Sequence, residues 1–205
     1  VVGFFVLGIL PSIERLFDIT TGMTLTDYRD PRNTILTQLQ DLAPGTFNHS
    51  QQVANIAEAA ADVIGADSLL AYVGGLYHDI GKMNKPEYFV ENQTGYNRHK
   101  DLKPSMSLLV IIGHVKDGIE IAHEHDLPRD LIHFIESHHG TTLVEYFYHA
   151  AMKDSKDNGE PINEMQFRYP GPKPKTKETA VLMIADAVES ASRVLPDPNP
   201  ARIET

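Results

Sequence analysis

Apolar and small residues recur along most of this chain with the spacing of helices rather than in strict alternation. Gly65 and Gly81 follow two such runs as expected helix ends, and Ser68, Pro104 and Pro128 open three others. No stretch alternates apolar and polar residues long enough to predict a strand, so we expect an all-α fold. The predicted helices span about residues 54–64, 68–80, 104–116, 128–140, 142–153 and 178–195.

The N-terminal segment is strongly apolar, with no charged residue before Glu14. It has neither a starting Met nor a basic region, which argues against a signal peptide. Its apolar stretch is about half as long as the roughly 20 residues that a transmembrane helix needs. We therefore expect either a buried N-terminal helix or the truncated end of a membrane helix. Nothing else in the sequence could span a bilayer.

Two long polar segments, 82–103 and 154–175, interrupt the helical pattern. Loops of this length inside a domain are often functional. The second segment continues into the window 168–177, which has four cations and no acid. This window is either a rim that binds an anion or a stiff, solvated linker.

Composition narrows the chemistry. The chain of 205 residues has 18 Lys and Arg against 28 Asp and Glu, a formal net charge of −10, with ten His and no Cys. The length fits one domain with a real core, or two small ones. The acidic excess disfavours long nucleic acids, whose binding requires many cations to displace counterions. Without Cys there are no thiolate ligands or cysteine nucleophiles, so any metal must be held by His and carboxylate.

Two carboxylates stand in apolar surroundings. Asp79, preceded by His78, follows the apolar run 69–77. Asp186 is the one charged residue within 180–188. Burial of an unpaired carboxylate is costly, so each of these side chains needs a cationic partner or a metal.

Four further histidines lie on apolar helices or at their ends. His49 shares a helical face with apolar residues, and His114 breaks an apolar run. His138 and His139 end a helix just before Gly140. One such histidine would ordinarily be a core residue, but five His and two Asp on successive helices suggest one convergent site. Seven ligands exceed the need of one zinc ion and suit two ions that share a carboxylate. Imidazole with carboxylate favours Fe, Mn, Co, Ni or Zn over Mg or Ca.

These residues follow a known order. The chain resembles the HD-domain metal-dependent phosphohydrolases, whose signature H…HD…D is matched by His49, His78-Asp79 and Asp186. Residues 78–82 match the HDIGK form of the motif, and His114, His138 and His139 match the dinuclear subset. The stretches 48–50, 138–142 and 167–174 are similar to the cytoplasmic domain of bacterial seven-transmembrane HD phosphodiesterases, which hydrolyse cyclic di-AMP.

The resemblance implies a fold, a cofactor and a reaction. The fold would be an HD-domain helical bundle with a metal site between its central helices. Two transition-metal ions, Fe or Mn, would be bridged by Asp79, and a hydroxide between them would open cyclic di-AMP to linear pApA. One ion would be held by His49, His78, Asp79 and Asp186, and the other by Asp79, His114, His138 and His139.

The resemblance also suggests substrate contacts and a cellular location. Lys82, three residues beyond Asp79, could bind a phosphate oxygen or support the leaving oxygen, and Arg168, Tyr169 and Lys173 could form a substrate rim, with Tyr169 stacked on a base. Residues 1–20 would be a membrane-proximal leader, the truncated end of a transmembrane helix, and 21–205 the phosphodiesterase domain. The domain would then lie on the cytoplasmic face of the cell membrane.

Two alternatives stay open. The chain could be an HD phosphohydrolase for another nucleotide, cyclic di-GMP or guanosine tetraphosphate. The cyclic di-GMP group normally carries a GYP-type motif that is missing here, and the guanosine-tetraphosphate type uses one metal, which leaves three of the histidines without a role. The other alternative is a non-catalytic, nucleotide-sensing HD module, although such a domain would be expected to have lost some ligands.

Overall fold

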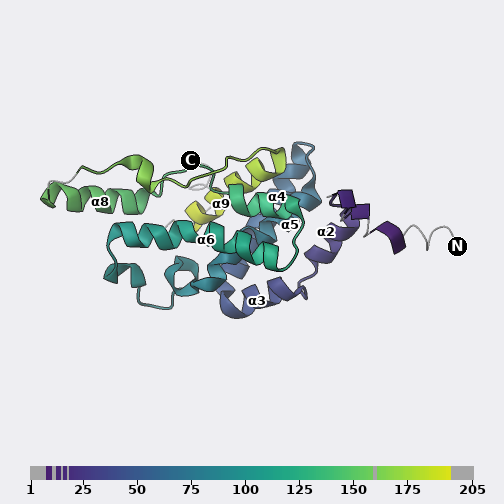
Figure 1. Cartoon of the computed structure of the whole chain (residues 1–205), viewed down its shortest axis with the longest axis horizontal. Coiled ribbons are helices and arrows are strands. Elements are labelled where there is room, and N and C mark those ends of the chain that lie inside the picture. The colour runs from purple at the N-terminus through teal and green to yellow at the C-terminus, as the bar shows by residue number, and fades with distance from the viewer. Residues whose placement is uncertain (1–7, 11–12, 15, 18, 159–160, 195–205) are drawn as a thin grey trace.

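The computed structural model describes residues 8–10, 13–14, 16–17, 19–158 and 161–194, and most of these are helical (Figure 1). Within this part of the chain there is no strand, only an isolated bridge between Leu143 and Arg168. The expected all-α class is confirmed. The α-helices are α2 (Gly22–Arg29), α3 (Thr34–Leu42), α4 (Pro44–Val63), α5 (Ser68–Tyr77), α6 (Pro104–Glu124), α7 (Arg129–Ser137), α8 (Glu145–Asn158) and α9 (Lys177–Val194). The 3-10 helices are η1 (Ile80–Asn84), η2 (Pro86–Tyr88), η3 (Val90–Asn92), η4 (Arg98–Asp101) and η5 (Glu164–Phe167).

The centre of the molecule is formed by α4, α5 and α9. Val53 and Ala57 of α4 are fully buried in one cluster with Leu182 and Ala185 of α9. Small residues also let α5 approach α4 closely: a Cβ at Gly75 of α5 would lie 2.6 Å from the Cα of Ala54 of α4. Figure 1 shows α8 at one end of the molecule and α2 toward the other. The chemistry-bearing helices therefore meet in the middle.

Several helix boundaries differ from the predicted ones. Helix α4 begins at Pro44 rather than near residue 54, and α6 continues to Glu124 rather than ending near residue 116. Helices α2 and α3 were not predicted; each is short and is capped by a polar side chain, Thr21 or Asn33. Local propensity gives little signal in these segments, so burial against the core decides their structure.

Gly81 does not stop a helix, contrary to the prediction. Helix α5 ends at Tyr77, and Gly81 lies inside η1, which continues the chain as a tighter helix. Gly81 packs directly against α6, where an added Cβ would lie 1.9 Å from the carbonyl oxygen of His114 and 2.4 Å from the backbone nitrogen of Gly118. Glycine at this position permits the close approach of two backbones.

The two predicted polar loops contain short helices. Segment 82–103 holds the end of η1 together with η2, η3 and η4, and segment 154–175 holds the end of α8 and η5. In the part of the chain that the structure describes, no helix is both long and apolar enough to cross a bilayer. The expected membrane-proximal leader, 1–20, falls largely on residues 1–7, 11–12, 15 and 18, which lie outside the described residues.

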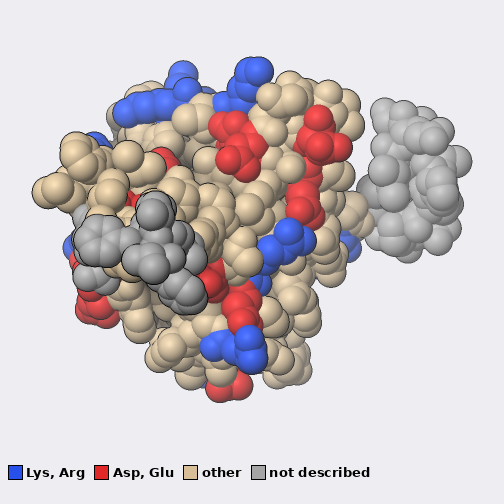
Figure 2. All heavy atoms as spheres, turned by 90° about the vertical axis from the view of Figure 1, so that its right-hand side faces the viewer, with Lys and Arg blue, Asp and Glu red and all other residues tan. Residues whose placement is uncertain are grey.

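Charged side chains of both signs share the surface at the N-terminal end of the molecule. Figure 2 looks at this end and shows Lys and Arg along its upper edge, and Asp and Glu below, interspersed with further Lys and Arg and with uncharged residues. The acidic excess of the chain is therefore not concentrated in one patch of this face.

Candidate metal centre

The structure brings the seven predicted ligands together at the meeting point of five helices. His49 comes from α4, His78 and Asp79 from the end of α5, and His114 from α6. His138 and His139 follow α7, and Asp186 lies on α9. They form two groups, each with ligand atoms within 4.8 Å of one another: His49, His78 and Asp186, and Asp79, His114, His138 and His139. We refer to these as the first and the second group.

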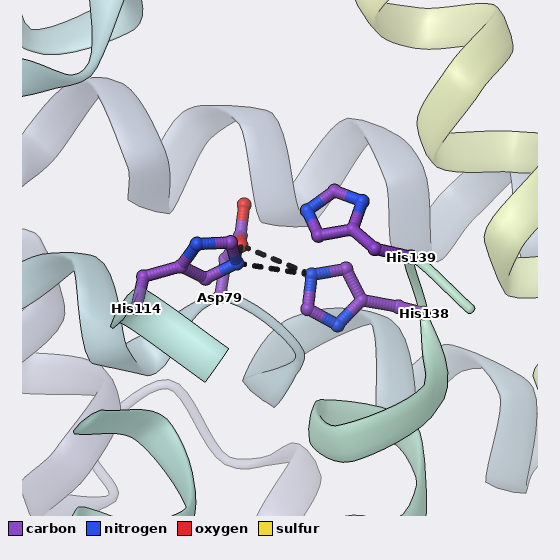
Figure 3. A group of neighbouring side chains, drawn as sticks. All are labelled: Asp79, His114, His138 and His139. Atoms are coloured by element: carbon purple, nitrogen blue, oxygen red, sulfur yellow. Dashed lines mark hydrogen bonds and ion pairs between the residues drawn. The ribbon is translucent and has the colours of Figure 1, made fainter. Parts of the chain in front are cut away.

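Asp79 lies between the two groups and presents one carboxylate oxygen to each. Its Oδ2 is 3.3 Å from His78 Nε2 and 3.5 Å from His49 Nε2. Its Oδ1 is 3.3 Å from His114 Nε2 and 3.5 Å from His138 Nε2 (Figure 3). This is the arrangement that a carboxylate shared by two ions requires.

The spacing of the donor atoms fits bound metal ions. Two donors that each lie about 2.1 Å from one ion are separated by about 3.0–3.4 Å. The Nε2 atoms of His114 and His138 are 3.2 Å apart, and His49 Nε2 is 3.1 Å from Asp186 Oδ1. In addition, His78 Nε2 and Asp79 Oδ1 are buried without a hydrogen-bond partner. Buried polar atoms are rarely left unpaired, so a cation in this cluster would satisfy both.

Local backbone contacts orient three of the histidines. Each places Nδ1 against the carbonyl oxygen three residues earlier in its helix, which leaves Nε2 as the atom that points into the cluster. The pairs are His78 with Gly75 at 2.8 Å, His114 with Ile111 at 2.5 Å, and His138 with Ile135 at 2.8 Å.

His49 is oriented by side chains instead. Its Nδ1 lies 2.5 Å from Glu189 Oε2, and the guanidinium of Arg193 donates to the same carboxylate and lies 2.9 Å from Nδ1. Glu189 is buried and was missed in the sequence. The available signal was its position one helical turn beyond Asp186, where a carboxylate can reach the same site.

Charges within the cluster shift its pKa values. Burial opposes ionisation of Asp79 and Asp186, but Lys82 and His78 act on Asp79, and a hydrogen bond from His49 acts on Asp186, so that both pKa values lie below the usual range. Burial likewise disfavours the charged form of His49, yet the adjacent Asp186 and Asp79 raise its pKa to about 10.

In the second group, the pKa values of two histidines are lowered rather than raised. Burial lowers the pKa of His138 and, together with the neighbouring His138 and His114, lowers the pKa of His139 well below its usual value. These two imidazoles are therefore neutral near pH 7 and ready to act as ligands.

Lys82 is held beside the cluster by two carboxylates. Its Nζ lies 2.7 Å from Asp79 Oδ2 and 2.9 Å from Glu91 Oε1. Burial disfavours the charged ammonium, but these two partners raise the pKa of Lys82 and keep it protonated. Glu91, on η3, is a second residue that the sequence analysis missed.

The three residues of the predicted substrate rim lie in different surroundings. The Tyr169 ring is buried and stacks on His139, with centroids 4.1 Å apart, so it covers a predicted ligand. Arg168 is engaged by Glu164 and by the carbonyl oxygen of Thr141. Lys173 is exposed, and no ion pair among the described residues includes it. Of these three, only Tyr169 is brought against a predicted metal ligand.

The comparison with family models gives the class of the protein. Residues 46–191 match the HD domain, so the chain belongs to the HD domain family. HD domains bind divalent metals, and the buried His and Asp cluster described above can hold such ions.

The chain is similar to parts of longer, named proteins. It is 43% identical over 200 residues to the cyclic-di-AMP phosphodiesterase PgpH of Bacillus subtilis (strain 168). This match covers 97% of this chain and 28% of that protein. It is 46% identical over 204 residues to PgpH of Listeria monocytogenes serotype 1/2a (strain 10403S), with coverage of 98% and 28%. The chain thus spans 28% of the length of these relatives.

A solved structure shares the fold. The crystal structure of the L. monocytogenes phosphodiesterase PgpH HD domain in complex with cyclic-di-AMP superposes with a TM-score of 0.80 at 48% sequence identity. The match covers 85% of this chain and 80% of that domain. The helical arrangement expected for an HD domain is thereby confirmed.

Proposed function

We propose that this chain is a metal-dependent phosphodiesterase that hydrolyses cyclic di-AMP to linear pApA. The observation that carries the proposal is the 48% identity to an HD domain that has been crystallised with cyclic-di-AMP. The arrangement of six buried or partly buried His and Asp side chains around Asp79 supports it.

The seven predicted ligands would hold two metal ions. His49, His78, Asp79 and Asp186 would hold one ion, and Asp79, His114, His138 and His139 the other. Bound ions in such a site supply positive charge that makes water more acidic and offsets charge on the phosphodiester. Water adds to phosphorus and the bond from phosphorus to O3′ breaks, which leaves a 5′-phosphate and a 3′-hydroxyl.

Lys82 would act on the phosphate directly. An ammonium has three N–H donors, and Asp79 and Glu91 accept two of them. The third can be donated to a phosphate oxygen or to the leaving O3′. Tyr169 would close the site above His139 and could meet a base, while Arg168 and Lys173 would belong to the outer rim.

We propose Fe or Mn as the resident metals. Five imidazoles and two carboxylates form a ligand set that suits these ions better than Mg or Ca. Metal analysis of protein purified without oxygen and without chelators tests this assignment. A preparation that retains only Zn while active would contradict it.

We also propose a location for the domain. Residues 1–20 would lead from a membrane helix into the domain of residues 21–205, on the cytoplasmic face of the membrane. The support is that the matched relatives are much longer proteins, of which this chain spans 28%. Fusion of a reporter to the full-length protein, tested for protease access from each side of the membrane, would check the orientation.

A substrate panel tests the activity. The purified chain, loaded with Mn or Fe(II), is given cyclic di-AMP, cyclic di-GMP and guanosine tetraphosphate, and its metal content is determined on the same sample. We expect about two ions per chain, as a dinuclear site requires, with cyclic di-AMP the preferred substrate. Preference for a guanine compound would show that cyclic di-AMP is not the substrate. Failure to hydrolyse any of the three compounds with both ions bound would favour a non-catalytic, nucleotide-sensing module.

A further inference from the structure

The polar segment 82–103 supplies a carboxylate to the predicted active site. Glu91 Oε1 is 2.9 Å from Lys82 Nζ, and the exposed fractions of the two side chains are 8% and 12%. The ammonium lies between Glu91 and Asp79 and over the ring of Phe89, 5.1 Å from its centroid. These contacts fix the position of the Lys82 ammonium beside the His and Asp cluster.

Glu91 is itself held by the first turn of α4. Thr46 Oγ1 donates to Glu91 Oε1 at 3.1 Å. The adjacent Asn92 is bonded twice to the same residue: its Nδ2 donates to Thr46 Oγ1 at 2.8 Å, and its Oδ1 accepts from the Thr46 backbone N–H at 3.1 Å. Three hydrogen bonds thus fix η3 to the helix that carries His49.

The contact between η3 and α4 depends on a glycine. A Cβ at Gly45 would lie 2.0 Å from the carbonyl oxygen of Glu91 and 2.8 Å from Asn92 Oδ1. No side chain fits there without displacing the segment. The position of Glu91 is therefore determined by backbone packing as well as by hydrogen bonds.

We propose that Glu91 is a positioning residue that holds Lys82 against Asp79 and directs its remaining N–H toward the substrate phosphate. This inference rests on the proposed phosphodiesterase function. It assigns a role to the polar segment 82–103, which reaches the site through the ion pair of Glu91 with Lys82. Glu91 acts through Lys82 and does not contact the substrate.

A double-mutant cycle tests this dependence. Glu91→Gln keeps the shape of the side chain and removes its charge, and Lys82→Met removes the ammonium but keeps most of its length. We expect Glu91→Gln to lower turnover of cyclic di-AMP by about 10- to 100-fold when Lys82 is present. In the Lys82→Met background it should change turnover by less than about twofold, because the partner through which it acts is gone.

Two further measurements remain informative even if Lys82→Met has no detectable activity. The first is the affinity of the Mn-loaded proteins for linear pApA, which should fall with Glu91→Gln only when Lys82 is present. The second is thermal unfolding of the four metal-free proteins. The fall in unfolding temperature of the double variant should be smaller than the sum of the falls in the two single variants, because each single variant leaves one buried charge without its partner.

Glu87→Gln is the matched control. Glu87 lies on η2 of the same segment, its side chain is 43% exposed, and its ion pair with Arg98 has a separation of 4.0 Å. This substitution should leave turnover, pApA affinity and the unfolding temperature within experimental error of the wild type, since exposed pairs contribute little.

The outcomes separate the two proposals. An equal loss of turnover from Glu91→Gln in both backgrounds, or additive unfolding shifts, would overturn the positioning role. So would a loss of bound Mn large enough to account for the whole fall in turnover. A wild-type protein that neither hydrolyses cyclic di-AMP nor binds pApA would instead refute the proposed function, while the unfolding cycle would still report on the coupling of Glu91 with Lys82.

Discussion

The two ligand groups share Asp79 but are supported in different ways. In the first group, His49 is held by the side chain of Glu189, which comes from a helix more than a hundred residues away in sequence. In the second group, His114 and His138 are held by carbonyl oxygens of their own helices. The first group therefore depends on a distant carboxylate at His49 in addition to the local backbone contact of His78, whereas the second depends on local backbone and on the Tyr169 ring.

Exposure also differs between the groups. The side chains of His49 and His78 are 3% and 0% exposed, whereas that of His139 is 24% exposed and is partly covered by the Tyr169 ring. The second group is therefore the more open half only at His139, because His114 and His138 are 1% and 0% exposed. Substitutions that act on one half and spare the other test this comparison.

The largest effect is expected from Asp79, because it serves both groups. Asp79→Ala should lower turnover of cyclic di-AMP by about 10³-fold or more and reduce occupancy at both metal positions. Turnover and metal content of the same preparation check this, with Asp79→Asn as a variant of the same shape. Asp117→Ala is the control, since Asp117 on α6 is 22% exposed and its ion pair with Lys85 has a separation of 3.8 Å. Near-wild-type turnover of Asp79→Ala would refute a shared carboxylate.

Removal of the charge on Glu189 should act on the first group alone. Glu189→Gln is expected to weaken binding of one of the two Mn ions by about 10- to 100-fold, because the carboxylate orients His49 and strengthens it as a ligand. Titration of the metal-free protein with Mn, followed by electron paramagnetic resonance, measures both affinities.

Glu178→Gln provides the matched control for Glu189 on the same helix. Glu178 accepts a hydrogen bond from the backbone N–H of Asp67, away from the ligands. This variant should leave both Mn affinities unchanged. If Glu189→Gln weakens both ions equally, the separation into two differently supported halves is wrong.

The two halves should also differ in their dependence on pH. His49 carries a proton in the metal-free protein because its pKa is raised to about 10, so an ion that binds there must displace that proton. Affinity of the first group should therefore rise with pH, by about tenfold per unit between pH 6 and 8. His138 and His139, whose pKa values are lowered, are already neutral and release none.

Calorimetry in buffers with different ionisation enthalpies counts the protons released with each ion. We expect about one for one ion and close to none for the other. The same proton release for both ions would contradict the difference between the groups.

The smallest effect is expected at the cover of the second group. Tyr169→Phe retains the ring that stacks on His139 and should change turnover by less than about twofold. Tyr169→Ala removes the ring and should lower turnover by about three- to tenfold, in keeping with the contribution of an aromatic pair. Equal effects of the two substitutions would show that the hydroxyl, and not the stacked ring, carries the role of Tyr169.

The candidate ligands could be predicted from the sequence because each interrupts an apolar helical run or stands at the end of one. A helix has a fixed period, so a polar residue on a buried face reveals its position without knowledge of its partner. The structure brings all seven of these residues together. Their roles as ligands, and those of Lys82, Arg168, Tyr169 and Lys173 toward substrate, stay predictions.

The supporting residues Glu91 and Glu189 are harder to recognise, because neither interrupts a continuous apolar run. Glu91 lies on a short 3-10 helix within a polar segment, where the sequence has no period to interpret. Glu189 is buried, but its neighbours Val188 and Ser190 are exposed, and the surrounding sequence resembles an ordinary amphipathic helix. The spacing of Glu189 from Asp186 was the one local signal, whereas the partners of both carboxylates are set by tertiary packing.

The contact of Gly81 with α6 has a consequence for how the centre tolerates change. The backbone of η1 sits against that of α6, and an added methyl group would come within 1.9 Å of the His114 carbonyl, where ordinary contact is about 3.5 Å. Since Asp79 lies two residues before this contact and His114 is part of it, the glycine works as a spacer that sets the width of the centre. Alanine at position 81 would push η1 away from α6 and so widen the distance between the Asp79 carboxylate and the His114 imidazole. The spacing of these two predicted ligands therefore depends on the absence of a side chain at position 81.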